Sequence, residues 1–433
     1  MSTTGFDTKD FEALDFFHAK PLYQNPYPYY EFLRAHGPVW REPNHDVVMI
    51  TGFDEAMAVY TDPATFSSCN AVSGPFPGLP VPLEGDDISA TIEQHRDELP
   101  FSDQLPTFDP PKHTAHRALL MRLITPKRLR ENEEFMWRLA DRQIDEFHAR
   151  GECDFIHDYA NPFTLLVIAD LLGVPEADHE TFRLELQGDR RPSQGYGKGP
   201  NATMAHKPLE FLYDRFSGYI EDRRREPRDD VMTGLATATF PDGSLPDVRE
   251  VMLIAANLFA AGQETTARLL GAMLRFVAER PELQEQLRSD RALVPAFVEE
   301  TLRLESPIQS DFRLSRVPTT VGAVELPAGT TVMVLNGAAN RDPREFDHPT
   351  ELRLDRPNGR QHLGFGFGIH TCAGAPLARA EARISLERLF DRTADLRVSD
   401  AEHGAAGARR YEYTPIFMLR GLEHLHLEFT PVG

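Results

Sequence analysis

The chain has 433 residues, with 46 Lys or Arg against 67 Asp or Glu, so its formal net charge is −21. This acidic balance argues against general nucleic-acid binding, and three cysteines in so long a chain exclude the small secreted proteins that depend on a disulfide framework. The first 20 residues lack the basic start and apolar run of a secretory signal. The longest charge-free apolar stretch, residues 251–263, is far shorter than the roughly 20 residues that span a bilayer. We therefore expect a cytoplasmic protein that uses no membrane.

Helical spacing of apolar residues dominates the chain, and the alternation typical of strands is confined to short segments. Two long stretches, 70–108 and 187–207, are predicted to be functional loops, because ordinary connections rarely exceed about 12–15 residues. In chain order we expect strands at 39–42 and 47–51, the first long loop, helices at 126–150 and 161–172, the second long loop, helices at 208–225, 247–280 and 281–303, strands at 313–317 and 331–335, a helix at 376–391 and a strand at 424–429.

The segment 247–280 is predicted to be a helix about 50 Å long that crosses the interior. Asp247 and Glu250 stand in capping-box positions at its start, and Pro281 ends the pattern. In its middle, small residues give way to Glu264 and Thr265. Small side chains let a flat, bulky group approach the backbone, and a Thr inside a helix can bond the carbonyl one turn back. Taken alone, these residues also fit a buried Glu paired with a distant Arg and ordinary helix packing.

The segment 365–374, FGFGIHTCAG, is the most informative in the chain. It places Cys372 just before a helix N-terminus, where backbone N–H groups favour the thiolate, a metal ligand. An arbitrary cysteine is more often a small buried hydrophobe. A zinc site lacks ligands here, because Cys69 and Cys153 stand in unrelated contexts. A single thiolate suffices for haem iron, since the porphyrin supplies the four in-plane ligands.

On these residues the chain resembles the cytochrome P450 family, and specifically its soluble bacterial, ferredoxin-dependent branch. The segment 365–372 matches the motif FGxGxHxC in full, 300–303 matches ExxR, and 261–266 matches the oxygen-activating helix segment. The resemblance covers essentially the whole chain. It implies a mainly α protein with a small β component, in which residues 1–433 form a single large domain built around the long central helix and a haem. Residues 1–20 would be a flexible N-terminus, and 70–108 and 187–207 would be substrate-access loops.

The implied cofactor is haem b, with O2 as co-substrate and electrons from NAD(P)H through a reductase and a ferredoxin. Buried propionates need charge-assisted donors. By resemblance, the residues that hold the iron, the propionates and the ring are Cys372, His113, Arg117, Arg313, His370, Phe365, Gly366 and Ala261. Glu300, Arg303 and Arg356 are implied to form a structural cluster buried under the cysteine loop.

The implied activity is a monooxygenase reaction, in which one oxygen atom of O2 enters the substrate and the other leaves as water. Thr265 would act as hydrogen-bond donor in oxygen activation and Glu264 as a proton relay to solvent. One alternative is a peroxygenase driven by hydrogen peroxide, and another is a non-catalytic haem sensor or carrier. The pair Glu264–Thr265 argues against both, because neither needs protons delivered there.

The substrate is expected to be a small hydrophobic molecule of terpenoid, steroid-like or aromatic type, because the residues at the family's contact positions are mostly apolar. These residues, each of which could equally be plain core, are Phe76, Leu79, Val81, Leu258, Phe259, Ile308, Gln309, Ser310, Ile416 and Phe417. Gln309 and Ser310 could hold a single hydroxyl or carbonyl group.

A ferredoxin is the expected protein partner of an otherwise monomeric enzyme. Residues 110–130 contain six basic side chains and no acidic one, and a local basic field would steer an acidic carrier. These side chains are Lys112, Arg117, Arg122, Lys127, Arg128 and Arg130. The alternative is that several of them pair with acids elsewhere in the fold.

Overall fold

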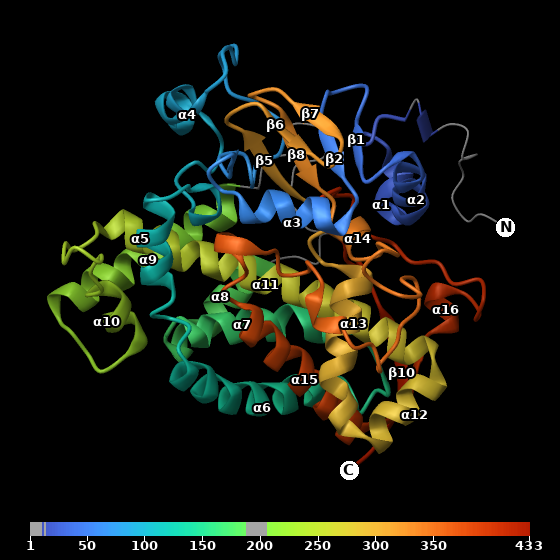
Figure 1. Ribbon diagram of the computed structural model, residues 1–433. Coiled ribbons are helices and arrows are strands. Elements are labelled where there is room, and N and C mark those ends of the chain that lie inside the picture. Colours follow the sequence, from blue (N-terminus) through green and yellow to red (C-terminus); the bar gives the residue numbers. More distant parts are fainter. Residues whose placement is uncertain (1–10, 13, 188–205) are drawn as a thin grey trace.

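The computed structural model describes residues 11–12, 14–187 and 206–433. A smaller part containing a mixed sheet lies against a larger helical part, and the predicted fold class, mainly α with a small β component, is confirmed (Figure 1). The helices are α1 (Lys20–Gln24), α2 (Tyr27–His36), α3 (Phe53–Thr61), α4 (Ser89–His95), α5 (Lys112–Leu120), α6 (Pro126–His148), α7 (Asn161–Leu171), α8 (His179–Gln187), α9 (His206–Arg225), α10 (Val231–Ala236), α11 (Val248–Glu279), α12 (Pro281–Ser289), α13 (Val294–Glu305), α14 (Asn336–Ala339), α15 (Ala375–Arg392) and α16 (Asp400–His403).

The strands form three sheets. The largest has the order β1-β2-β8-β5-β3, in which β2 and β8 are parallel, and the others are β4-β10-β9 and the hairpin β6-β7. The strands are β1 (Val39–Arg41), β2 (Val48–Ile50), β3 (Phe66–Ser67), β4 (Glu152–Asp154), β5 (Asp311–Ser315), β6 (Thr319–Val321), β7 (Val324–Leu326), β8 (Thr331–Val334), β9 (Thr393–Val398) and β10 (His426–Pro431).

Both faces of the five-stranded sheet are covered. Successive side chains of a strand point to opposite faces, and accordingly Val48 and Ile50 of β2 join one buried cluster whereas Met49 joins another. The first cluster includes residues of α3, and the second includes residues of α2. The five-stranded sheet is therefore a buried layer with a side-chain cluster on each face.

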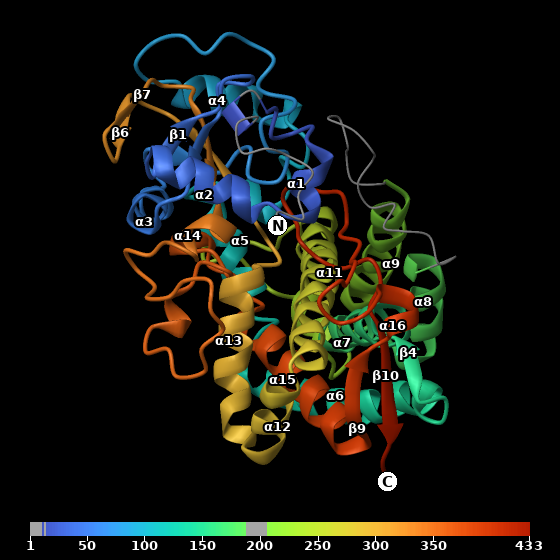
Figure 2. The same cartoon turned by 90° about the vertical axis from the view of Figure 1, so that its right-hand side faces the viewer.

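Helix α11 runs through the middle of the helical part, as Figures 1 and 2 show. The predicted capping box is present, because the Asp247 carboxylate accepts from the Glu250 N–H at 2.7 Å and the Glu250 side chain accepts from the Asp247 N–H at 3.1 Å. Its 32 residues span about 48 Å. Gly262 lies so close to Ile168 of α7 that a methyl group there would meet the Ile168 side chain at 3.2 Å.

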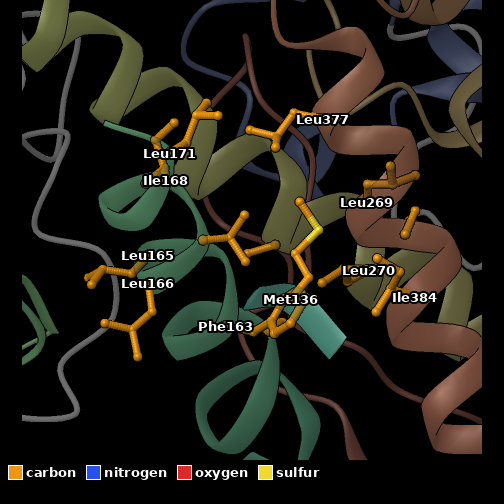
Figure 3. Packing of buried hydrophobic residues seen from close by; sticks show 14 of the residues in the cluster. Met136, Phe163, Leu165, Leu166, Ile168, Leu171, Leu269, Leu270, Leu377 and Ile384 are labelled. Atoms are coloured by element: carbon orange, nitrogen blue, oxygen red, sulfur yellow. The ribbon is translucent and has the colours of Figure 1, made fainter. Parts of the chain in front are cut away.

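The helical core gathers apolar side chains from α11 and from three helices packed around it. Figure 3 shows Leu269 and Leu270 of α11 in this cluster with Phe163 of α7, Met136 of α6 and Ile384 of α15. A fully buried side chain of this size contributes roughly 1.5–3 kcal/mol. This packing holds α11 and α15 in fixed positions on either side of the cavity described below.

Two predictions differ from the structure, and most of a third falls outside the described residues. The helix expected over 281–303 is two helices, because Asp290 caps a 3-10 turn, accepting from the Ala292 N–H at 3.0 Å, before α13 begins. The first long loop contains α4, and residues 188–205 of the second lie outside the described residues.

The expected flexible N-terminus is wrong for residues 14–20. There, Phe16 and Phe17 are buried and both rings pack against Phe417, with centroids 6.2 and 5.2 Å apart. Residues 1–10 and 13 lie outside the described residues.

Within the described ranges, no helix combines the length and the apolar character that crossing a bilayer requires.

Candidate active site

A large cavity of about 1720 Å³ lies between α11 and the segment that carries Cys372. Of the predicted iron, haem and oxygen residues, all ten line it: Cys372, His113, Arg117, Arg313, His370, Phe365, Gly366, Ala261, Glu264 and Thr265. Residues separated by up to 259 positions in the sequence therefore meet at one place.

Cys372 lies between a short 3-10 turn (Gly368–His370) and the start of α15. Its N–H donates to the Phe365 carbonyl at 2.9 Å, which closes the loop. Its side chain is exposed to the cavity although it lies deep in the protein. The thiol is thus presented to the cavity from a loop whose two ends are tied together.

Burial raises the pKa of the Cys372 thiol, and this effect outweighs the backbone N–H groups of Gly374 and Ala375 and the charge of Arg117, which lower it. The backbone N–H groups at the helix start thus favour the thiolate, as the sequence indicated, without offsetting the cost of its burial. A coordinated metal ion deprotonates a bound thiol outright, so the thiolate at this position depends on metal binding.

The loop requires glycine at two positions, since Gly366 and Gly368 have φ of +62° and +70°. We expect Gly368→Ala to lower the stability of the protein and its haem content. The added methyl group would collide with the Tyr60 carbonyl oxygen of α3, in addition to the left-handed strain of about 1–3 kcal/mol. Thermal unfolding measures the loss.

Gly407→Ala is the matched control, because its φ of +82° gives similar backbone strain, no heavy atom lies within 4 Å of the added group, and Gly407 is not part of the cavity lining. Equal destabilisation by the two substitutions would contradict a role for the close approach to Tyr60.

Four basic side chains converge on one end of the cavity. The rings of His113 and His370 lie 4.2 Å apart, and Arg313 and Arg117 line the same cavity near enough for their charges to act on His370. Arg313 donates to its neighbouring carbonyl at Phe312 and Arg117 to the carbonyl of Thr371, at 2.6 and 2.7 Å. Both guanidinium groups keep further N–H donors.

This group is built for anions. Burial, and then the charge of Arg313, lowers the pKa of His370 to about 3, and burial and Arg117 lower the pKa of His113. His113 Nε2 is buried without a hydrogen-bond partner. An orphaned buried nitrogen among basic groups fits a bound carboxylate, and two propionates of a haem whose iron meets Cys372 supply such groups. The residues present therefore fit haem.

The predicted proton-relay residues stand on the cavity face of α11. Thr265 Oγ1 donates to the Ala261 carbonyl one turn back at 2.7 Å, as expected for a Thr inside a helix. Glu264 forms an ion pair with Arg268, and Arg268 Nη1 donates to Thr414 Oγ1 at 3.2 Å. The acid thus pairs with an Arg one turn away in its own helix. The ion pair that the sequence allowed is therefore present, but with an Arg of the same helix and not with a distant one.

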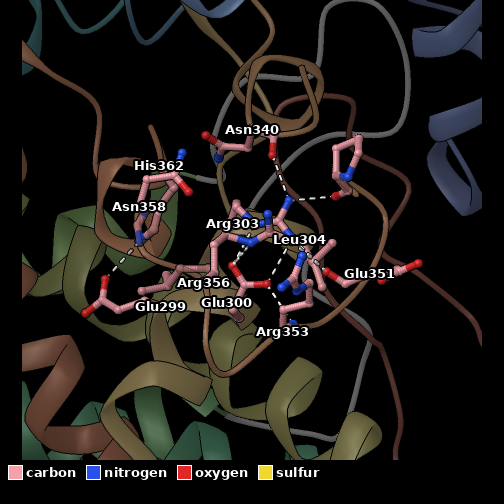
Figure 4. Close-up of polar contacts among 12 residues, drawn as sticks. Glu299, Glu300, Arg303, Leu304, Asn340, Glu351, Arg353, Arg356, Asn358 and His362 are labelled. Carbon is pink, nitrogen blue, oxygen red and sulfur yellow. Dashed lines mark hydrogen bonds and ion pairs between the residues drawn. The ribbon is translucent and has the colours of Figure 1, made fainter. Parts of the chain in front are cut away.

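The ExxR residues form the buried cluster that the resemblance implied (Figure 4). Glu300 accepts from Arg303 Nε and from Arg356 Nε, each at 2.8 Å. Arg303 also donates to the carbonyls of Asn340, Pro349 and Glu351, at 2.6 to 3.0 Å. The cluster does not line the cavity, which supports a structural role; instead it ties α13 to the segment that leads into the cysteine loop.

Of the ten predicted substrate contacts, Leu258, Phe259 and Ile308 line the cavity. The other seven, all within the described residues, are not part of its lining: Phe76, Leu79, Val81, Gln309, Ser310, Ile416 and Phe417.

Packing explains these differences. Phe76 and Phe417 join an aromatic cluster around Phe17, with ring centroids 5.4 and 5.2 Å from it. Leu79 packs against a small separate core. Gln309 is buried and fully engaged, because its amide nitrogen donates to the carbonyls of Glu305 and Ser306 and its oxygen accepts from Tyr30.

Sequence reasoning missed several cavity residues. The predicted loop 70–108 does reach the cavity, but through its two ends, at residues 71–72 and 104–106, and the turn near 417 reaches it through Met418 and Leu419. The apolar side chains at the two ends of this loop are the only sequence signal that could have predicted these contacts with the cavity. Ser68, whose Oγ lies 3.0 Å from His370 Nε2, carries no sequence signal.

The comparisons with known proteins agree with this site. A family profile described as cytochrome P450 matches residues 199–393. Cytochrome P450 144 of Mycobacterium tuberculosis is 35% identical over 422 residues, which cover 96% of this chain and 91% of the relative. The solved structure of substrate-free CYP150A6 from Mycobacterium marinum has 53% identity and a TM-score of 0.92, covering 98% of this chain and all of the other.

A more distant solved structure is CYP109E1 of Bacillus megaterium in complex with testosterone. It has 27% identity and a TM-score of 0.75, over 93% of this chain and 99% of the other. Near-complete coverage in both sequence and structure, together with a cavity lined by the cysteine, propionate and relay residues, settles the family. The chain belongs to the cytochrome P450 family, alongside bacterial members, and is a haem-thiolate monooxygenase.

Proposed function

We propose that the enzyme hydroxylates a hydrophobic small molecule of terpenoid, steroid-like or aromatic type, with electrons that a ferredoxin delivers from NAD(P)H and a reductase. One observation carries the proposal. Thr265 and Glu264 of α11 line the same cavity as Cys372. A monomeric cytoplasmic enzyme is part of the same proposal.

The walls of the cavity favour an apolar substrate. Leu258, Phe259 and Ile308 line it, and Phe259 is braced by the rings of Phe182 and Phe216, with centroids 5.5 and 6.1 Å away. This apolar stretch of wall suits a hydrophobic ligand, and polar lining residues such as Asn257 remain to fix its orientation.

Asn257 is the best candidate to hold that handle in place of Gln309. It lines the cavity on the same face of α11 as Ala261 and Thr265, since residues four apart share a helix face. Eight residues separate it from Thr265, or about 12 Å along the helix. A rigid molecule with a hydroxyl or carbonyl group at one end would span this distance, and CYP109E1, the relative solved with testosterone, takes a ligand of this kind.

The chain's own residues supply placement and protons. Bound haem supplies the oxygen chemistry, with the Cys372 thiolate favouring O–O cleavage. Thr265 Oγ1, which now donates to Ala261, would turn to hydrogen-bond the oxygen-binding position. Glu264 would carry protons from water to Thr265, and to do so its side chain would break the ion pair with Arg268. The Glu264 side chain is 35% exposed, so water can reach it.

The basic stretch 110–130 divides into paired and unpaired side chains. Arg128 donates to the carbonyls of Asp170 and Leu171, and Lys127 and Arg128 lie 3.7 and 3.5 Å from Glu131. Arg122 and Arg130 are exposed and form no ion pair within the described part of the chain. Arg122 is therefore the better site for contact with a ferredoxin, and Arg128 has a structural role.

We expect Arg122→Glu to slow reduction by a ferredoxin about tenfold at low salt, with a smaller effect at 0.5 M salt, because screening shortens electrostatic steering. Stopped-flow reduction under carbon monoxide measures the rate. Lys20→Glu on α1 is the control, since Lys20 is exposed and the charge change is the same. An unchanged rate in the Arg122 variant would exclude that residue from the docking surface.

Turnover with NAD(P)H and a surrogate reductase and ferredoxin tests the proposed activity, with substrates chosen from a panel that shifts the haem spin state. We expect product only with electrons from the ferredoxin. Equal or greater turnover with hydrogen peroxide alone would favour the peroxygenase, and absence of turnover with every spin-shifting compound would favour a carrier or sensor.

A further inference from the structure

A second polar cluster lies away from the Cys372 loop, where the C-terminal strand pairs with β4. In this antiparallel pair His426 is directly opposite Asp154, so their side chains are neighbours on one face. His424 precedes His426 by two residues and shares that face. The rings of His424 and His426 stack with centroids 5.8 Å apart and an interplanar angle of 12°.

The Asp154 carboxylate is held in a fixed orientation. Its Oδ1 accepts from the N–H groups of Leu425 and Ile156 at 3.1 and 3.3 Å. Its Oδ2 is left for imidazoles, and lies 2.7 Å from His424 Nδ1 and 3.0 Å from His157 Nδ1. Although burial opposes it, hydrogen bonds from His157 and His424 hold the pKa of Asp154 well below its usual range.

The backbone of His426 is fixed by a further histidine. His403 Nε2 accepts from the His426 N–H at 2.9 Å, which leaves His403 Nδ1 as donor to the Arg410 carbonyl at 3.0 Å. Both nitrogens of His403 are therefore used, and it supports the cluster from outside. This contact fixes the backbone that carries His426, and with it the position from which the His426 ring projects.

We propose that Asp154, His424 and His426 bind a zinc ion. One ligand atom from each residue lies within 4.8 Å of the others. Ligands at about 2.0–2.2 Å from tetrahedral zinc lie roughly 3.3 Å from one another, so the three need only small movements. In the metal-free form a proton between His424 Nδ1 and Asp154 Oδ2 occupies the place of the ion. Water takes the fourth position, and His157 orients the carboxylate.

Access and location support an ion that binds from solvent. The His424 side chain is 46% exposed and the Asp154 side chain 15%, so the ring forms the open edge of a site with a buried base. His157 and His424 also line the large cavity. A zinc ion there would tie the start of β10 to the end of β4, beside that cavity.

A second group, Asp15, His18 and His45, also meets the distance condition. Its carboxylate is held less firmly, because Asp15 Oδ1 accepts from one backbone N–H, that of Phe17, and the Asp15 side chain is 33% exposed against 15% for Asp154. We assign the ion to the Asp154 cluster, and use the Asp15 cluster as the comparison.

The test uses tag-free, haem-loaded protein dialysed against a zinc chloride solution and then against metal-free buffer, with zinc and iron measured together by inductively coupled plasma mass spectrometry. We expect one zinc per haem iron, and an unfolding temperature that rises with zinc concentration. His424→Ala and His426→Ala should each weaken zinc binding at least a hundredfold in calorimetric titration, whereas His18→Ala should retain the full equivalent.

His424→Ala is the variant least expected to unfold, because His424 is the most exposed of the three proposed ligands. The carbon monoxide spectrum reports folded enzyme in every variant. Absence of retained zinc in the wild type, retention by the His424 and His426 variants, or loss in His18→Ala alone would each overturn the assignment.

Discussion

Thr265→Ala is expected to consume NAD(P)H at a rate similar to that of the wild type while most of the reducing equivalents leave as hydrogen peroxide. Hydroxylation uses O2, two electrons and two protons to give the alcohol and water, whereas the uncoupled path gives hydrogen peroxide from the same inputs. Without the hydroxyl group on α11, proton delivery to the oxygen-binding position fails. Positioned proton transfer contributes about 10²–10⁴-fold, so product formed per NAD(P)H should fall at least about tenfold.

Two variants give this experiment its controls. Thr265→Ser keeps a hydroxyl and should recover most of the coupling. Thr164→Ala removes a Thr in the same local setting, since Thr164 Oγ1 donates to the Ala160 carbonyl at 3.0 Å on α7, but Thr164 is not among the cavity residues. Wild-type coupling in Thr265→Ala, or equal uncoupling in Thr164→Ala, would contradict the assigned role.

Among the substitutions considered, Glu300→Gln is expected to cause the largest fall in the free energy of unfolding. It leaves Arg303 and Arg356 buried around a neutral amide, and removal of one partner from a buried ion pair costs about 3–5 kcal/mol. Although burial opposes it, the Arg303 hydrogen bond lowers the pKa of Glu300 in the folded protein. Its stabilising contribution is thus complete above the unfolded pKa and is lost as pH falls through the folded pKa. The difference between variant and wild type should narrow at acid pH in denaturant titrations.

Glu180→Gln is the matched control for that measurement. Glu180 and Arg183 also stand three residues apart on a helix, but their side chains are 62% and 43% exposed. Exposed pairs of this kind contribute about 0.2–1 kcal/mol. Similar destabilisation by the two substitutions would show that the buried cluster has no special structural role.

The parts of the site that the sequence predicted are those whose geometry is local. The capping box of α11, the turn of Thr265 toward Ala261 and the glycine-spaced loop before Cys372 each depend on residues within a few positions of each other. The propionate-binding residues were predicted only from the resemblance to the family. That they meet at one cavity became visible only in the tertiary structure.

The substrate wall could not be predicted in the same way. Whether Phe76 or Val72 faces the cavity depends on where the N-terminal aromatic residues pack. The Phe17 ring packs against both Phe76 and Phe417. Apolar type alone does not distinguish a wall residue from a core residue. The break between α12 and α13 did have a local signal, in Asp290 and in Pro295 at the start of α13, but the continuous apolar spacing concealed it.

The carbon monoxide spectrum of the reduced, haem-loaded protein tests the central claim most directly, because its position depends on the ligand opposite carbon monoxide. With the Cys372 thiolate as that ligand, the spectrum should show the strongly red-shifted band of a haem thiolate, and Cys372→Ser should lose it while retaining the fold. An unshifted band in the wild type, or an unaltered red-shifted band in Cys372→Ser, would contradict the assignment of Cys372 as the iron ligand.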